Sequence, residues 1–393
     1  METPIEQLIT SNIKKMPPSF VKGMLGAASR SDLVSLSVGN PSPKAFPMEE
    51  LHESMSRAVE RYGTKLFQYS QTPGIAELRE FVADRYNKKL NLGITAADVL
   101  ITTGSQQALD IIAKLVLEPG DGVVVEEPGY LGALRTFLQY APTFHSVPLR
   151  EGGLDVARFG EAVSAPKTKL VYTVPNFQNP SGLTYSAENR EALYNVLKNE
   201  NVIYIEDDPY GELRFKGENL PYVAVGRYEN YIFLGSFSKT VTPGARVGFV
   251  ICKNKELMEA ITNLKESTDV HTSTIAQYVL YDYVTHNDYE AHIEDIRKLY
   301  KEQCELMLSC IAENFPDYVE YTKPEGGMFI WCTLPEGQRS IELWKKALEN
   351  GVAVAPGEPF YVDPQNVRTF RMNYTQPTPE QIRLGIERLG KLL

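Results

Sequence analysis

The sequence is poor in the residues that build metal sites and disulfide frameworks. It has four cysteines and five histidines in 393 residues, and neither set shows the close spacing of a zinc site. The formal net charge is −10, which argues against a surface built to bind nucleic acid. The chain has no apolar run long enough to span a bilayer, and its first residues lack the apolar centre of a signal peptide. We therefore expect a soluble, cytoplasmic protein without a metal site, whose cysteines are core thiols.

One stretch stands out by its chemistry, because a lysine lies among small hydroxylated residues between two apolar, strand-like runs (231–234 and 247–251). Lys239 would be largely desolvated there, which lowers the pKa of its ammonium group and leaves an amine able to form a Schiff base. Three nearby residues could hold a phosphate, namely Ser236, Ser238 and Arg246. An amine beside a phosphate site is what pyridoxal phosphate requires. Taken alone, the stretch is explained equally well by an ordinary lysine at a strand end.

Apolar, β-branched strands alternate with helices through most of the chain. We expect strands at 99–103, 122–126, 169–174, 202–205 and 231–234, and helices at 48–62, 75–90, 108–116, 131–139 and 186–199. This alternation predicts an α/β fold in which a largely parallel sheet has helices on both faces, as a three-layer αβα domain. Ligands of such folds bind outside the carboxyl ends of the strands, and each polar cluster of this sequence follows one of those ends.

The chain after residue 290 has a different pattern. A long amphipathic helix at 289–315 precedes several short strands and a last helix at 379–392, which predicts a smaller α+β domain. We expect three units: an arm with a small-domain segment over 1–45, a large cofactor-binding domain over 46–290, and a small C-terminal domain over 291–393.

Several polar positions allow two interpretations. A helix that begins after Gly104 with Ser105 and Gln106 presents free N–H groups and a positive dipole end to an anion, although helix capping is the commoner use of such a serine. Tyr69 is either a packing residue or a hydroxyl offered to a site. The turn at Gly39 is either the edge of a site or an ordinary surface turn.

Eight blocks of the sequence resemble, in the same order, those of fold type I pyridoxal-phosphate aminotransferases. The similar subgroup includes the kynurenine and 2-aminoadipate aminotransferases. The blocks are SVGNP, TTGSQQALD, EEPGY, PNFQNPSG, EDDPYGEL, SFSKTVTPGARVGF, KPEGGMFIW and FRMNY, from about residue 36 to residue 374. Any one block is a weak signal, but eight in register across nearly the whole chain are highly specific.

The resemblance implies roles for individual residues around pyridoxal phosphate. Lys239 would carry the cofactor and shuttle a proton, and Asp207 would pair with the pyridine nitrogen so that the ring can accept electrons. Asp208 would point the opposite way along an extended chain and is expected to be structural. The ring would be stacked by Tyr130 and its phenolic oxygen bonded by Asn179 and Tyr210. The phosphate would be held by Ser105, Gln106, Ser236, Ser238 and Arg246.

The resemblance also implies how the substrate and a second subunit take part. Arg371, which would otherwise be interpreted as a surface or ion-pair residue, would clamp the substrate α-carboxylate, with Gly39 and Asn179 beside it. Tyr69 of a neighbouring subunit would complete the phosphate site, which implies a homodimer with shared active sites. Three aromatic residues near the expected mouth suit large apolar substrates or ordinary packing equally well: Tyr69, Phe177 and Phe360.

The implied reaction is ping-pong transamination, from an L-amino acid to a 2-oxo acid such as 2-oxoglutarate. The amino acid could be aromatic, aliphatic or 2-aminoadipate-like, and we expect broad specificity. A β-eliminating lyase on the same fold would use the same residues. A ligand-sensing domain of a transcription regulator is the remaining alternative, but it would need a winged-helix segment, for which we see no room before residue 30.

Overall fold

The computed structural model describes residues 7–14, 16–18, 20, 23, 26, 30 and 32–393. Much of the arm predicted within residues 1–45 therefore lies outside the described residues. Among the residues that are described, α1 spans Ser11–Lys14 and β1 spans Val34–Ser35. No helix in these ranges is long and apolar enough to cross a membrane.

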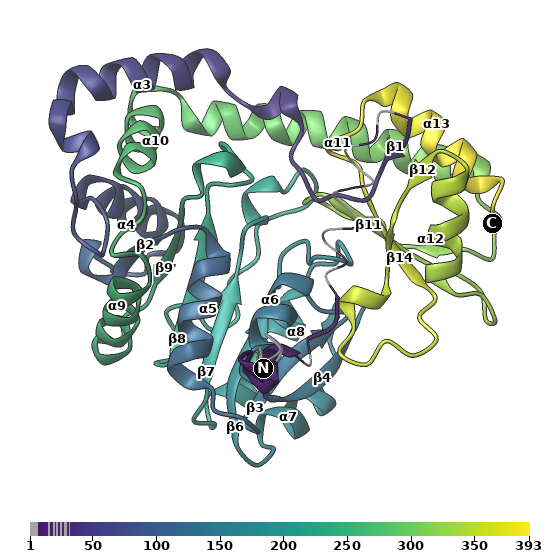
Figure 1. Cartoon of the computed structure of the whole chain (residues 1–393), viewed down its shortest axis with the longest axis horizontal. Coiled ribbons are helices and arrows are strands. Elements are labelled where there is room, and N and C mark those ends of the chain that lie inside the picture. The colour runs from purple at the N-terminus through teal and green to yellow at the C-terminus, as the bar shows by residue number, and fades with distance from the viewer. Residues whose placement is uncertain are drawn as a thin grey trace, which may run out of the picture.

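The largest layer is an eight-stranded sheet with the strand order β2-β9-β8-β7-β6-β3-β4-β5 (Figure 1). Its strands are β2 (Val99–Thr102), β3 (Gly122–Glu127), β4 (Thr143–Arg150), β5 (Gly153–Leu154), β6 (Thr168–Thr173), β7 (Ile203–Asp207), β8 (Tyr231–Ser236) and β9 (Gly248–Ile251). β9 is antiparallel to both neighbours and β5 is antiparallel to β4, whereas the other neighbouring pairs are parallel. The prediction of a mostly parallel sheet is confirmed.

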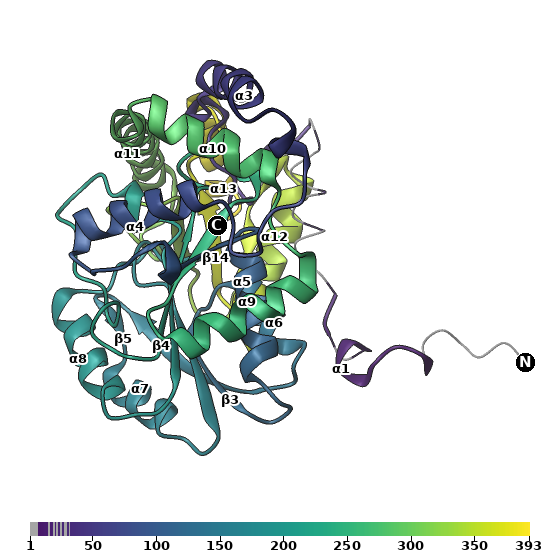
Figure 2. The same ribbon diagram turned by 90° about the vertical axis from the view of Figure 1, so that its left-hand side faces the viewer.

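Helices cover both faces of this sheet, which confirms the three-layer αβα arrangement. Alternate strand residues enter two separate cores, so that Leu100 and Val123 belong to one and Ile101 and Val124 to the other. The first core includes residues of α5 (Ser105–Val116), α6 (Leu131–Leu138) and α9 (Lys255–Asp269). The second includes residues of α4 (Ala76–Leu90), α7 (Val156–Val163), α8 (Ala187–Leu197) and α10 (Thr274–His286). Figure 2 shows α7 and α8 on one side of β3 and β4, and α5, α6 and α9 on the other.

A second, antiparallel sheet lies toward the C-terminus. Its order is β10 (Glu320–Tyr321), β11 (Phe329–Thr333), β14 (Thr369–Asn373) and β13 (Ala355–Pro356), with α12 (Ser340–Glu349) and α13 (Pro379–Gly390) nearby. β1 pairs in parallel with β12 (Val352–Ala353), so a segment that precedes α3 (Met48–Tyr62) joins the C-terminal strands. The long helix α11 (Tyr289–Asn314) runs from the neighbourhood of α10 to that of α13 (Figure 1). The unit boundaries given above stay a prediction.

The cysteines are free thiols buried in the protein, which confirms the expectation drawn from their spacing. They are Cys252, Cys304, Cys310 and Cys332. Burial raises the pKa of the Cys252 and Cys304 thiols to about 12, so these side chains behave as small apolar groups.

Candidate active site

A cavity of about 700 Å³ opens at the edge of the large sheet where the parallel strands end. Every residue predicted to contact the cofactor or the substrate lines it, with the exception of Tyr69. They are Gly39, Ser105, Gln106, Tyr130, Asn179, Asp207, Tyr210, Ser236, Ser238, Lys239, Arg246 and Arg371. Because β9 runs opposite to β8, Arg246 reaches this edge from the amino end of its strand.

Lys239 follows the carboxyl end of β8, and the pKa of its ammonium group is lowered. Its Nζ donates a hydrogen bond to the carbonyl oxygen of Gly39 at 2.9 Å. Burial lowers the pKa of Lys239 to about 8, and the positive charges of Arg371 and Arg246 act in the same direction. A neutral, nucleophilic amine is therefore available close to neutral pH, as predicted for a desolvated lysine.

Asp207 is the last residue of β7 and is buried. Its Oδ2 accepts a hydrogen bond from the Tyr172 hydroxyl at 2.9 Å, whereas its buried Oδ1 has no partner among the described residues. Burial raises the pKa of Asp207 to about 7. An orphaned carboxylate oxygen in a cavity wall fits a ligand that brings a charged N–H group, such as a protonated pyridine ring.

The next residue, Asp208, has the structural role expected from the alternation of an extended chain. Its carboxylate accepts hydrogen bonds from the backbone N–H of Gly211, at 2.8 Å, and from the Tyr222 hydroxyl. Asp208 does not line the cavity of Asp207 within the described chain.

Ser105 is the first residue of α5, and its side chain does not cap the helix. The N-cap position is Gly104, and the buried Ser105 Oγ has no partner among the described residues. The capping interpretation of Ser105 is therefore wrong. Arg246 lies against the same turn, because a Cβ on Gly104 would be 2.5 Å from Arg246 Nη2, and Gly104 has a φ of +76°. A glycine is required here so that the guanidinium can approach the helix start.

Hydroxyl and N–H donors that could bind an anion lie around this turn. Ser236 and Ser238 lie close together, since the Ser236 Oγ accepts the backbone N–H of Ser238 at 3.1 Å. The side chain of Gln106 is turned away toward α6, where its Nε2 donates to the carbonyl oxygen of Gly132 at 3.2 Å and to the Thr136 hydroxyl. Gln106 can therefore offer an anion its backbone N–H, which is free in the first turn of a helix.

Arg371 of β14 is buried, which contradicts its interpretation as a surface residue. Its Nη1 donates to Asn179 Oδ1 and its Nη2 to the carbonyl oxygen of Ser37, both at 2.7 Å, and its buried Nε has no partner in the described chain. The guanidinium carbon lies 4.3 Å from the ring centre of Phe329 and 5.0 Å from that of Phe360. Burial lowers the pKa of Arg371 to about 10, so the group stays charged at neutral pH.

Asn179 links this arginine to the other wall of the cavity. Its Nδ2 donates to the Tyr210 hydroxyl at 3.3 Å while its Oδ1 is held by Arg371. Burial raises the pKa of Tyr210, and it raises that of Tyr130 to about 12, so both phenols are neutral hydrogen-bond donors.

The aromatic residues considered for the mouth do not line the cavity. Phe177 and Phe360 are fully buried, and Phe177 lies 4.7 Å beneath the guanidinium of Arg214, so packing explains both. Tyr69 lies just after the short helix η3 (Gly63–Phe67), where it is 81% exposed with its ring against His271. In this chain Tyr69 therefore contributes nothing to the cavity.

One polar residue that holds a predicted site residue in place was not predicted from the sequence. Tyr172 lies in β6 and both lines the cavity and holds Asp207. The available signal was its position near the carboxyl end of an apolar strand, on the face that alternation shares with Leu170. The apolar part of the wall comes from Val38, Leu131 and Val174.

The fold and this cavity define a fold type I enzyme of the pyridoxal-phosphate class, and comparisons with known proteins lead to its family. The family described as aminotransferase class I and II matches residues 31–389. The aromatic-amino-acid aminotransferase 1 of Thermococcus litoralis is 36% identical over 99% of this chain and 94% of its own. A kynurenine aminotransferase from Pyrococcus horikoshii, solved with PMP, is 38% identical with a TM-score of 0.93, covering 99% of this chain and 97% of that one.

A third comparison agrees with these two. The α-aminoadipate aminotransferase LysN from Thermus thermophilus, solved with a phosphopyridoxyl-leucine adduct, is 33% identical with a TM-score of 0.92, over 100% of this chain and 98% of that one. The chain belongs to the class I and II aminotransferases. It is a pyridoxal-phosphate-dependent aminotransferase, and the comparisons favour transamination over the β-eliminating lyase.

Proposed function

We propose that the residues of this cavity hold pyridoxal phosphate and pass the amino group of an L-amino acid, by a ping-pong route, to a 2-oxo acid such as 2-oxoglutarate. The observation that carries the proposal is that Lys239, with a pKa of about 8, and Asp207, with an unpartnered Oδ1, line one cavity. The first residue supplies a nucleophilic amine and the second a partner for a ring nitrogen.

Each side chain of the cavity then has one task. The bound cofactor supplies a ring that stores the electron pair left when the substrate α-proton departs. Asp207 would keep the ring nitrogen charged. The Nζ of Lys239 would take the α-proton of the substrate and later return it. Tyr210 and Asn179 would donate hydrogen bonds to the phenolic oxygen of the ring, and Tyr130 would cover one of its faces.

The anionic groups of cofactor and substrate are bound at opposite ends of the cavity. The hydroxyls of Ser105, Ser236 and Ser238, the backbone N–H of Gln106 and the guanidinium of Arg246 would hold the phosphate. Arg371 binds the substrate α-carboxylate through two parallel N–H donors, and the two rings beside it fix the plane of the guanidinium. Gly39 lies beside this arginine, since a Cβ there would be 2.8 Å from Phe329 and 4.0 Å from Arg371 Nη2, so its backbone would border the bound carboxylate.

The substrate range is proposed to be broad, with donors such as aromatic and aliphatic amino acids. Each cation that lines the cavity in the described chain, Lys239, Arg246 and Arg371, already has a task. The remaining wall is largely apolar, which favours uncharged side chains. The relatives named above are an aromatic-amino-acid, a kynurenine and an α-aminoadipate aminotransferase. A 2-aminoadipate-like donor is therefore also a candidate, and it is one of the amino acids to be added in the spectroscopic test described below.

We further propose a cytoplasmic homodimer in which Tyr69 completes the phosphate site of the partner. Large apolar side chains are exposed along α3, in η3 and just after it, and where α9 gives way to α10, and a contiguous exposed apolar surface of this kind marks a protein–protein interface. They are Met48, Met55, Val59, Phe67, Tyr69, Val270 and Ile275. Mixing Lys239→Ala with Tyr69→Ala subunits tests this, because a mixed dimer regains one intact site. Activity that stays at the level of the separate variants would contradict the shared site.

The direct test of the reaction is the absorption spectrum of the purified enzyme as single L-amino acids are added. We expect the band of the lysine-bound cofactor to be replaced by that of the pyridoxamine form, and 2-oxoglutarate to restore it. Release of pyruvate and ammonia without the pyridoxamine band would establish the lyase instead. The absence of any band with added cofactor would refute the role of Lys239.

A further inference from the structure

One face of α11 carries five polar side chains that form hydrogen bonds with segments of the active site. Their spacing of three to five residues places them on one side of a helix. They are Tyr289, His292, Arg297, Tyr300 and Gln303. None of them lines the cavity, yet each makes a hydrogen bond to a segment that supplies a cavity residue. We call these five residues the alignment face.

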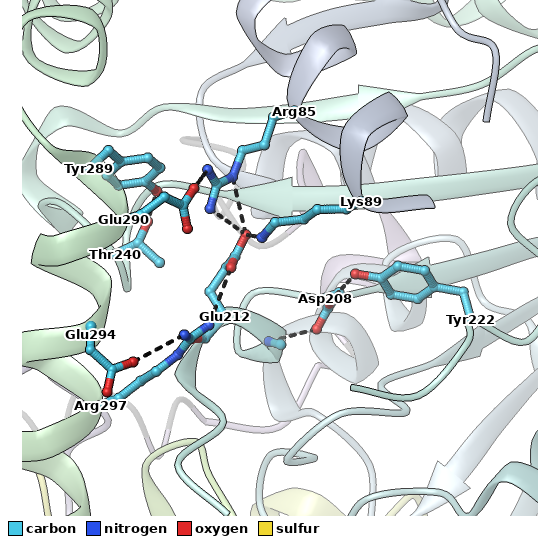
Figure 3. A network of polar contacts seen from close by, with 11 residues as sticks. Arg85, Lys89, Asp208, Glu212, Tyr222, Thr240, Tyr289, Glu290, Glu294 and Arg297 are labelled. Carbon is cyan, nitrogen blue, oxygen red and sulfur yellow. Dashed lines mark hydrogen bonds and ion pairs between the residues drawn. The ribbon is translucent and has the colours of Figure 1, made fainter. Parts of the chain in front are cut away.

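The first two residues of the alignment face hold the segment of Lys239. The hydroxyl of Tyr289 donates to Thr240 Oγ1 at 2.7 Å, and His292 Nε2 donates to the carbonyl oxygen of Thr240 at 2.9 Å. Figure 3 shows Tyr289 beside Thr240, with the guanidinium of Arg85 against the tyrosine ring, 4.7 Å from its centre. Both backbone and side chain of the residue next to Lys239 are therefore fixed by α11.

The third residue holds the turn that follows Tyr210. Arg297 Nε donates to the carbonyl oxygen of Glu212 at 2.7 Å, within η5 (Gly211–Leu213). Arg85 and Lys89 of α4 converge on the Glu212 carboxylate (Figure 3). Burial alone would raise the pKa of Glu212, but the positive charges of Lys89 and Arg85 bring it below the usual value. Glu212 therefore stays charged, and its ion pairs with α4 hold the turn in place.

The last two residues hold the segments on the substrate side. The Tyr300 hydroxyl accepts the backbone N–H of Ser42 at 3.1 Å, close in sequence to Gly39. Gln303 Nε2 donates to the carbonyl oxygen of Pro377 at 2.9 Å, beyond the end of the strand that carries Arg371. These two segments are also joined to each other, because Thr375 Oγ1 donates to the carbonyl oxygen of Asn40 at 2.9 Å.

We propose that the alignment face sets the relative positions of four segments of the active site, those of Gly39, Tyr210, Lys239 and Arg371, and that its five members are positioning residues for the reaction. The inference rests on the function proposed for the cavity. Different members of the alignment face act on different sides of the active site. Tyr289, His292 and Arg297 position the cofactor side, through Lys239 and Tyr210, whereas Tyr300 and Gln303 position the substrate side, through Gly39 and Arg371.

Two matched variants test this division, because Tyr289→Phe and Tyr300→Phe each remove one hydroxyl from the same helix. We expect Tyr289→Phe to shift the pH midpoint of the bound-cofactor absorption band and to lower kcat, with little change in KM. We expect Tyr300→Phe to leave the band unchanged and to raise KM for the amino acid on the order of tenfold, since a buried N–H loses its acceptor. Ser309→Ala, on the exposed side of α11, is the control that alters neither.

The thermal midpoint of each cofactor-free variant separates positioning from general destabilisation. If both variants change the same parameters in proportion to their loss of stability, or if neither changes any, the inference is overturned. Should a variant fail to fold, Thr240→Val removes the same hydrogen bond as Tyr289→Phe, and Gln303→Met replaces Tyr300→Phe. A wild-type enzyme that shows neither the cofactor band nor transamination would refute the proposed function. An active wild-type enzyme whose variants all change the same parameters, or none, would refute only the positioning role of the alignment face.

Discussion

Replacing Asp207 with asparagine should stabilise the cofactor-free protein above neutral pH while it removes most of the activity. The carboxyl group is buried, and its Oδ1 has no partner in the described chain, so ionisation is costly in the absence of the cofactor. Asparagine has nearly the same shape, and its Oδ1 can still accept the Tyr172 hydroxyl, but it cannot ionise.

The magnitude follows from the pKa of Asp207, which rises from 3.8 to about 7. Because the folded-state pKa lies above the unfolded value, the folded protein binds the proton more tightly, and stability falls as pH rises from about 4 to about 7. At roughly 1.4 kcal/mol per pKa unit, the ionised group destabilises the folded state by about 4 kcal/mol above pH 7. The unpaired amide of asparagine costs about 1–3 kcal/mol at every pH. The expected net gain is roughly 1–3 kcal/mol at pH 8 and close to none at pH 5.

The assay is denaturant unfolding of both cofactor-free proteins at pH 5 and at pH 8, followed by kcat of the reconstituted enzymes. The stability difference should grow with pH, and kcat of the variant should fall at least about a hundredfold, as when a charge-stabilising group is removed. An equal pH dependence of the two unfolding free energies, or a variant less stable than wild type at pH 8, would refute the account of Asp207.

Three further predictions concern single side chains of the cavity. With a pKa of about 8, Lys239 should react with an amine reagent in the cofactor-free protein with a midpoint near pH 8, well below that of exposed lysines, as peptide mass spectrometry can show. Arg371→Lys keeps the charge but loses the paired donors, so KM for the amino acid should rise on the order of a hundredfold while the cofactor band is unchanged. Ser105→Ala removes a hydroxyl without a partner in the described chain, so the cofactor Kd should rise about tenfold by titration while the thermal midpoint of the cofactor-free protein holds.

The elements that the sequence predicted best are those with a strong period and clear ends. α3 begins and ends at the predicted Met48 and Tyr62. β4 and α7 were not predicted. The β4 segment contains His145 and Pro148 and is only half-buried, so it lacks the apolar run of the central strands, and its strand conformation depends on pairing with β3.

The residue types of the site could be collected from the sequence because parallel strands end at one edge of a sheet. Their contacts could not, since those join segments that are far apart in the chain. The contact of Asp207 with Tyr172 exists only after β7 has paired with β6, and the pair of rings around Arg371 exists only after β11 and the segment of Phe360 have packed against β14. The direction of the Gln106 side chain likewise depends on Thr136 of a neighbouring helix, which no local pattern encodes.

The position of β9 between β8 and β2 has a consequence for how the enzyme is made. β2 is an edge strand whose neighbour is β9, and Val99 pairs with Ile251, so β2 has no place in the sheet until the chain has been synthesised past residue 251. Ser105 follows β2, and Arg246 lies two residues before β9. The residues proposed to bind the phosphate group can therefore come together only in a chain that has been synthesised beyond residue 251.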